Sequence, residues 1–111
     1  MSQYVIIFRQ EPNQLSDVDL QNRARETGAW AQRENAAGHK LDPHILVESS
    51  HWAGPPVAGG TPVTALLFLE ARDFADAMAV ARAHPGIRYG ASVEVRPWAR
   101  PPTFAPAAEV G

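Results

Sequence analysis

Three side chains near the end of the chain offer the clearest chemistry in this sequence. His84 precedes a Pro-Gly step, and Glu94 and Arg96 follow it, two residues apart, in an alternating segment. A histidine can move a proton near neutral pH, and the arginine fork suits carboxylates. We therefore predict His84 as a catalytic acid or base, with Arg96 and Glu94 binding the substrate. The plainer interpretation is that His84 complements a helix dipole, and that Glu94 and Arg96 form an ion pair that fixes a strand.

Aromatic and imidazole side chains also gather before residue 62. His39, His44 and His51 lack the i, i+4 spacing and the acidic partner of a helical metal motif, so no metal is expected. We predict that His51 and Trp52, in a Gly- and Pro-rich loop, lie near the mouth of any ligand site; the alternative is that Trp52 anchors the loop. The sequence carries no phosphate-binding or dinucleotide motif, and no cofactor is expected.

These residues must be positioned by short strands and two helices. Runs of strand-forming residues predict strands over 3–9, 41–49, 63–70 and 91–97. Capping residues predict helices over 17–37 and 73–84. In the first and third strands both faces are apolar, which indicates that both faces are covered.

The resulting order, β-α-β-β-α-β, predicts a ferredoxin-like α+β fold. In that motif a four-stranded antiparallel sheet carries both helices on one face. The other face would expose a large apolar patch on a single chain. We therefore expect a homodimer, packed sheet to sheet about a twofold axis.

The composition sets further bounds. The 111 residues suit one domain, with 45% hydrophobic residues, a net charge of −2 and no cysteine, which excludes disulfides, thiolate nucleophiles and Cys-ligated zinc. No basic block suggests nucleic acid, and the longest apolar run is too short for a membrane span. No leader pattern opens the sequence, so we expect a cytoplasmic protein. We assign residues 1–99 to the domain and residues 100–111 to a Pro-rich tail that is not part of its core.

Residues 84–97, which end Glu-Val-Arg-Pro, resemble the closing motif of the YCII-related, or DGPF-domain, family. Residues 4–8 and 77–81 are similar to its first strand and second helix. The resemblance extends over residues 3–98. The loop Ala53-Gly54-Pro55-Pro56 stands where the family has Asp-Gly-Pro-Phe, with Ala53 and Pro56 replacing the Asp and the Phe.

The resemblance implies a dimeric α/β barrel. Some related enzymes pair a His on the first helix with an Asp after the second, and the resemblance places His84 at the Asp position. The first helix here has no histidine, and Trp30 is its only ring residue, so this pair is not carried over.

Two functions remain open. In the first, the chain binds a small molecule, neutral or anionic, in a cleft of the dimeric barrel and carries out cofactor-free acid–base chemistry of the lyase or isomerase type. Alternatively, it is a non-catalytic regulatory or interaction module that uses the fold only to dimerise. An enclosed pocket on which His84 and Arg96 converge would favour the first, and a solid, filled barrel the second.

Overall fold

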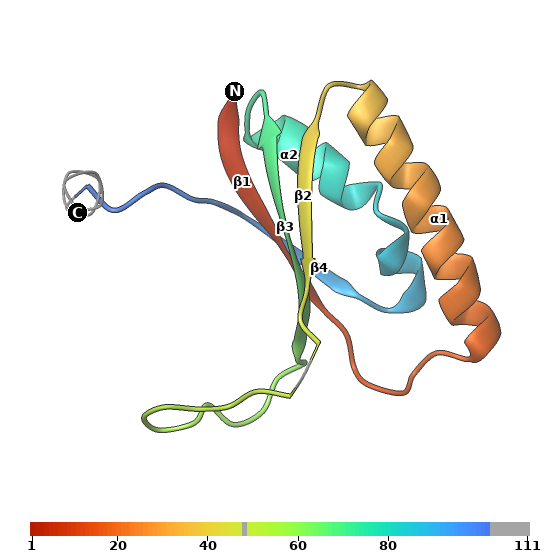
Figure 1. The fold of residues 1–111 in the computed structure, drawn as a ribbon, viewed down its shortest axis with the longest axis vertical. Helices are drawn as coiled ribbons and strands as arrows, with labels where there is room; N and C mark the ends of the chain where they lie inside the picture. The colour runs from red at the N-terminus through yellow and green to blue at the C-terminus, as the bar shows by residue number, and fades with distance from the viewer. Residues whose placement is uncertain (48, 103–111) are drawn as a thin grey trace.

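The computed structural model describes residues 1–47 and 49–102. Most of the predicted C-terminal tail, including Phe104, lies outside the described residues. The elements follow in the predicted order (Figure 1): β1 Ser2–Arg9, α1 Asp17–Ala36, β2 Lys40–Ile45, β3 Val63–Ala71, α2 Phe74–Arg82, the short 3₁₀ helix η1 Pro85–Tyr89 and β4 Ser92–Pro97.

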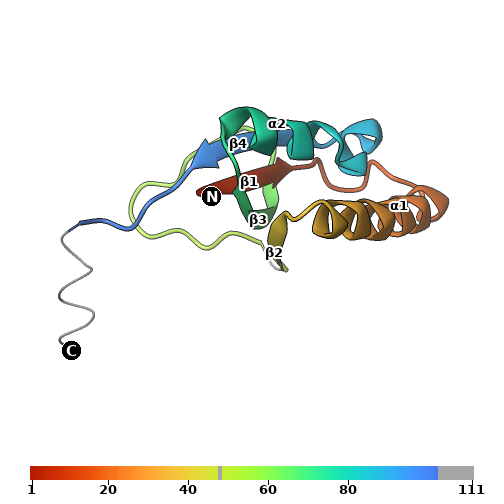
Figure 2. The same ribbon diagram turned by 90° about the horizontal axis from the view of Figure 1, so that it is seen from above.

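The strands form one antiparallel sheet in the order β2-β3-β1-β4. Both helices lie on the same side of it (Figure 1). Figure 2 shows α2 beside β1 and β4, and α1 toward the β2 side. This is the ferredoxin-like α+β fold that the order of elements predicts.

The core lies between the sheet and α2. Alternate residues of β1 and β3 face the helices, and their register sets Tyr4 opposite Leu69 and Ile6 opposite Leu67. The side chains of α2 that meet them are small or branched, so this helix packs close to the sheet. Its core residues are Ala77, Val80 and Ala81, each at most 3% exposed.

Helix α1 is defined by its ends more than by an apolar stripe. The Ser16 hydroxyl accepts a hydrogen bond from the Asp19 N–H at 3.1 Å and caps the first turn. At the other end Gly38 has φ +92°, a left-handed conformation that glycine adopts without strain. Of the twenty residues between these ends only Trp30 is buried. The helix therefore contacts the rest of the chain through few side chains.

Two predicted boundaries are wrong. β2 ends at Ile45 instead of residue 49. The Leu46 N–H still donates to the Thr64 carbonyl, and after this bond the chain separates from β3. α2 ends at Arg82 because Pro85 disfavours a helical conformation at His84. His84 is instead extended, with φ −68° and ψ 128°, and caps η1.

The sheet face away from the helices carries a second apolar row. Val5 and Ile7 of β1 lie beside Leu66 and Phe68 of β3, and all four are partly exposed. Trp98 extends this row, with its ring centroid 5.7 Å from that of Phe68. Within the described residues, no helix is long and apolar enough to cross a bilayer.

Candidate functional site

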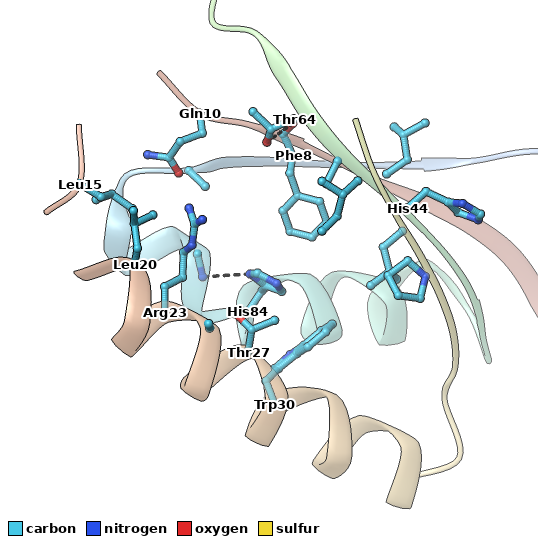
Figure 3. Close-up of a pocket in the computed structure, with 18 of the residues that line it drawn as sticks. Phe8, Gln10, Leu15, Leu20, Arg23, Thr27, Trp30, His44, Thr64 and His84 are labelled. Atoms are coloured by element: carbon cyan, nitrogen blue, oxygen red, sulfur yellow. Dashed lines mark hydrogen bonds between the residues drawn. The ribbon is translucent and has the colours of Figure 1, made fainter. Parts of the chain in front are cut away.

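A cleft of about 870 Å³ lies between α1 and the helix-facing side of the sheet (Figure 3). Three of the α1 side chains that line it, Ala24, Thr27 and Ala31, are short. The residues of α1 that line it are Asp17, Leu20, Arg23, Ala24, Thr27, Trp30, Ala31 and Asn35. A cleft of this size, mainly apolar with a few polar groups, is typical of a small-molecule site.

His84 lies at the centre of the cleft wall. Its Nδ1 accepts a hydrogen bond from the Gly86 N–H at 2.9 Å. Burial, with the nearby Arg23 guanidinium, lowers the pKa of His84 to about 4. The ring is therefore neutral at pH 7, and because Nδ1 is an acceptor the hydrogen resides on Nε2.

Two aromatic rings fix the plane of the imidazole. The Phe8 centroid lies 4.6 Å from that of His84, and the Trp30 centroid lies 4.7 Å from it in an edge arrangement. Figure 3 shows the His84 ring between these two side chains, one from β1 and one from α1. Among the hydrogen bonds of the described residues none involves Nε2, so its N–H is available to a ligand in the cleft.

Arg23 supplies a positive charge to the cleft that was not predicted from the sequence. Its guanidinium extends from α1 into the cleft (Figure 3), and the residue is half-buried. An arginine in the middle of a helix is normally solvated, so its residue type does not indicate a place in a cleft. Its spacing could have done so, because Arg23, Thr27 and Trp30 follow an i, i+4, i+7 pattern and share one helix face.

The wall opposite α1 is held by hydrogen bonds within the chain. Gln10 Nε2 donates to the Tyr89 carbonyl at 2.9 Å, and Thr64 Oγ1 donates to the Phe8 carbonyl at 3.4 Å. Glu26 of α1 accepts from both the Tyr89 hydroxyl and the Arg88 guanidinium. These bonds lower the pKa of Glu26 and raise the pKa of Tyr89. They join η1, and with it the cap at His84, to α1.

Arg96 and Glu94 do not lie in this cleft. They pair with Val5 and Ile7, so their side chains lie on the open face of the sheet, away from the helices. Glu94 forms an ion pair with Arg9 of β1 at 2.7 Å, so its partner is Arg9 and not the Arg96 of the plainer interpretation. A ligand bound at His84 is therefore separated from Arg96 of the same chain by the sheet. This corrects the expectation that the two converge, since alternation alone did not show which face the helices cover.

The loop residues are also placed away from the cleft. His51 and Trp52 are exposed, Trp52 by 55%, and neither is among the residues that line the cleft. Their role near a ligand stays a prediction. The other two histidines have carboxylate partners: His39 Nε2 lies 3.0 Å from Asp76, and His44 Nε2 lies 3.1 Å from Asp42.

Comparisons with known proteins support the fold. No family model matches the chain, and no curated protein matches its sequence. A solved structure that is similar is 5-chloro-2-hydroxyhydroquinone dehydrochlorinase, TftG, from Burkholderia phenoliruptrix AC1100, in complex with 2,5-dihydroxybenzoquinone. It has a TM-score of 0.59 and 18% sequence identity over 89% of this chain and 95% of that chain. The resemblance seen in the sequence is thus supported at the level of the fold.

Proposed function

We propose that this protein binds a small anionic molecule with an apolar body in the cleft beneath α1. The observation that carries the proposal is the pairing of two unlike groups in a mainly apolar cleft. Arg23 supplies a positive charge, and the neutral His84 presents an Nε2–H without a partner among the described residues. Together they suit an oxyanion, with Arg23 for its charge and His84 for one of its lone pairs.

The hydrogen on Nε2 determines what His84 contributes to a reaction. With Nδ1 engaged by Gly86, the neutral ring donates a hydrogen bond but has no free nitrogen to accept a proton. It is therefore suited to polarising a carbonyl and stabilising the oxygen of an enolate as that oxygen becomes negative. Cofactor-free lyase or isomerase chemistry would use His84 at the substrate oxygen. This differs from a role as general base.

The similar structure guides the choice of probe. TftG is a dehydrochlorinase in complex with 2,5-dihydroxybenzoquinone. A dihydroxybenzoquinone ionises to a flat anion with oxygens on a ring, which is the ligand chemistry that the cleft suits. We therefore expect 2,5-dihydroxybenzoquinone and benzoate to bind, and benzyl alcohol, which lacks the charge, to bind more weakly.

Calorimetric titration at pH 7 tests this proposal. Arg23→Gln should weaken binding of both anions about tenfold, the equivalent of about 1.4 kcal/mol, and leave benzyl alcohol unaffected. Arg25→Gln is the matched control, because Arg25 is exposed on the same helix and does not line the cleft. Failure of wild type to bind either anion, or equal affinities of the two arginine variants, would contradict the proposal.

The protein is also proposed to form a homodimer through its open sheet face. The row Val5, Ile7, Leu66 and Phe68 is apolar, and the rings of Trp98 and His44 both pack against Phe68. The interaction-module alternative depends on this face alone, and it predicts a dimer that binds none of the three probes. The cleft with its oriented imidazole favours ligand binding in addition to dimerisation.

A further inference from the structure

The environment of His84 depends on how the last turn of α2 is hydrogen-bonded, because His84 lacks the usual helical bond to the Val80 carbonyl. In a continuing helix the His84 N–H would donate to the Val80 carbonyl, four residues earlier. Here Pro85 keeps His84 extended, and its N–H donates to the Ala81 carbonyl at 3.1 Å. The Val80 carbonyl, buried near the end of α2, is left without its helical donor.

Trp30 supplies the missing donor. Its indole Nε1–H donates to the Val80 carbonyl at 3.3 Å, across from α1 to α2. Trp30 is 2% exposed and is the only residue of α1 that is buried. The bond therefore satisfies the last turn of α2 at the point where the chain turns away into His84.

The same side chain also contacts the imidazole directly. The edge arrangement of Trp30 and His84, at 71° between ring planes, restricts rotation of the histidine about its side-chain torsions. Gly86 provides the remaining constraint. A Cβ at Gly86 would lie 2.9 Å from His84 Nδ1, so only glycine allows its amide to approach that nitrogen without a shift.

We propose that Trp30 is the positioning residue of the cleft, holding His84 so that its Nε2–H points at a bound ligand. It acts in two ways: its N–H ends α2 at Val80, and its ring supports the imidazole. Gly86 completes the arrangement from the opposite side of the histidine. This positioning role rests on the proposed function, because it matters only if the cleft binds a ligand. The orientation of His84 can nevertheless be tested without a ligand.

The test is the tautomer and titration of His84, read by long-range ¹H–¹⁵N NMR on the intact protein. In wild type we expect the Nε2–H tautomer and a pKa of about 4. In Trp30→Phe, which lacks the N–H, we expect mixed tautomers and a pKa closer to the usual 6.5. Trp98→Phe is the matched control, and signals of His39 and His51 should not move in either variant.

A second variant keeps the test decisive if Trp30→Phe fails to fold. Replacing Trp30 by benzothienylalanine retains the fused ring and removes only the N–H donor. Gly86→Ala should produce the same change from the other side by displacing Nδ1. If these variants lose stability but keep the wild-type tautomer and titration of His84, Trp30 is merely structural and the inference is overturned.

The outcomes separate this inference from the proposed function. If wild type binds neither benzoate nor 2,5-dihydroxybenzoquinone, while Trp30→Phe still changes the His84 tautomer, the positioning role stands and the proposed ligand class fails. If both anions bind and Trp30→Phe leaves both the His84 tautomer and the affinity unchanged, the ligand class stands and the positioning role fails.

Discussion

His84 makes the stability of the fold depend on pH over a defined range. Its pKa is lowered to about 4 in the folded chain, against 6.5 for an ordinary histidine. Between these values the unfolded chain binds a proton that the folded chain does not, so the free energy of unfolding decreases as pH falls from 6.5 toward 4. The full shift would correspond to roughly 3 kcal/mol, and partial exposure of the ring reduces our expectation to about 1–2 kcal/mol.

Urea unfolding at pH 7 and pH 4.5 measures this loss. We expect His84→Gln to lose less stability between the two pH values than wild type does. His51→Gln is the control, because His51 is exposed in the loop. The effect is distinct from that of Asp76, whose pKa is lowered by Arg72 and His39 and whose contribution is lost only below pH 3.8. Equal pH dependence in wild type and His84→Gln would contradict the buried, neutral state of His84.

Individual residues also show where sequence reasoning stops. Proline and glycine after His84 indicated the break in the helix, although α2 ends at Arg82. The pairing of His84 with Arg96 failed because both faces of the central strands are apolar, and polarity alone could not assign Arg96 to a face. Arg23 was missed because a charged helical residue usually faces solvent. Here Ala24 and Thr27 beside it on α1 are small, and its guanidinium extends into the cleft.

The elements themselves were largely predictable, because their signals are local. Caps at Ser16 and Asp73 and the alternation of β1 and β3 depend on neighbouring residues. The distance of α1 from the sheet was not predictable in this way. It depends on side chains of several elements together, chiefly Trp30, whose indole N–H donates to the Val80 carbonyl of α2, while the small Ala24 and Ala31 line the cleft.

A buried carboxylate joins α2 to the start of β2. Asp76 accepts hydrogen bonds from the Arg72 N–H at 3.0 Å and from the Arg72 side chain at 3.3 Å, and its Oδ2 lies 3.0 Å from His39 Nε2. Its side chain is only 7% exposed. Since buried hydrogen bonds to a charged group are costly to lose, we expect Asp76→Asn to reduce the free energy of unfolding by about 2 kcal/mol.

The exposed Arg9–Glu94 pair offers a matched comparison. These side chains are 35% and 44% exposed, so Glu94→Gln should cost less than about 1 kcal/mol. Both variants replace a carboxylate by its amide, and urea unfolding at pH 7 compares them directly. An equal cost for Asp76→Asn and Glu94→Gln would show that burial of Asp76 adds nothing to its ion pair.

At the scale of the whole molecule, one chain provides helices for only one face of its sheet. The helix-covered face contains the core and the cleft, and the open face carries the row from Val5 to Phe68. The sequence predicted this asymmetry from the number of helices and the doubly apolar strands. It could not predict that the proposed ligand site and the proposed dimer interface lie on opposite faces. The sequence pattern did not show that Arg96 and Glu94 lie on the open face while His84 lies on the helix-covered face.

We expect the protein to sediment as a dimer at micromolar concentration, at about twice the monomer mass of 12.1 kDa. Phe68 lies centrally in the open row, so Phe68→Lys would place a charge in the interface and should give a monomer. Val18→Lys is the control, because Val18 is 65% exposed on α1 and away from that face. A monomeric wild type would contradict the dimer, and a dimeric Phe68→Lys would move the interface elsewhere. Because the cleft lies on the other face, monomeric Phe68→Lys should bind benzoate with unchanged affinity, whereas a loss of binding on dissociation would show that the partner subunit completes the site.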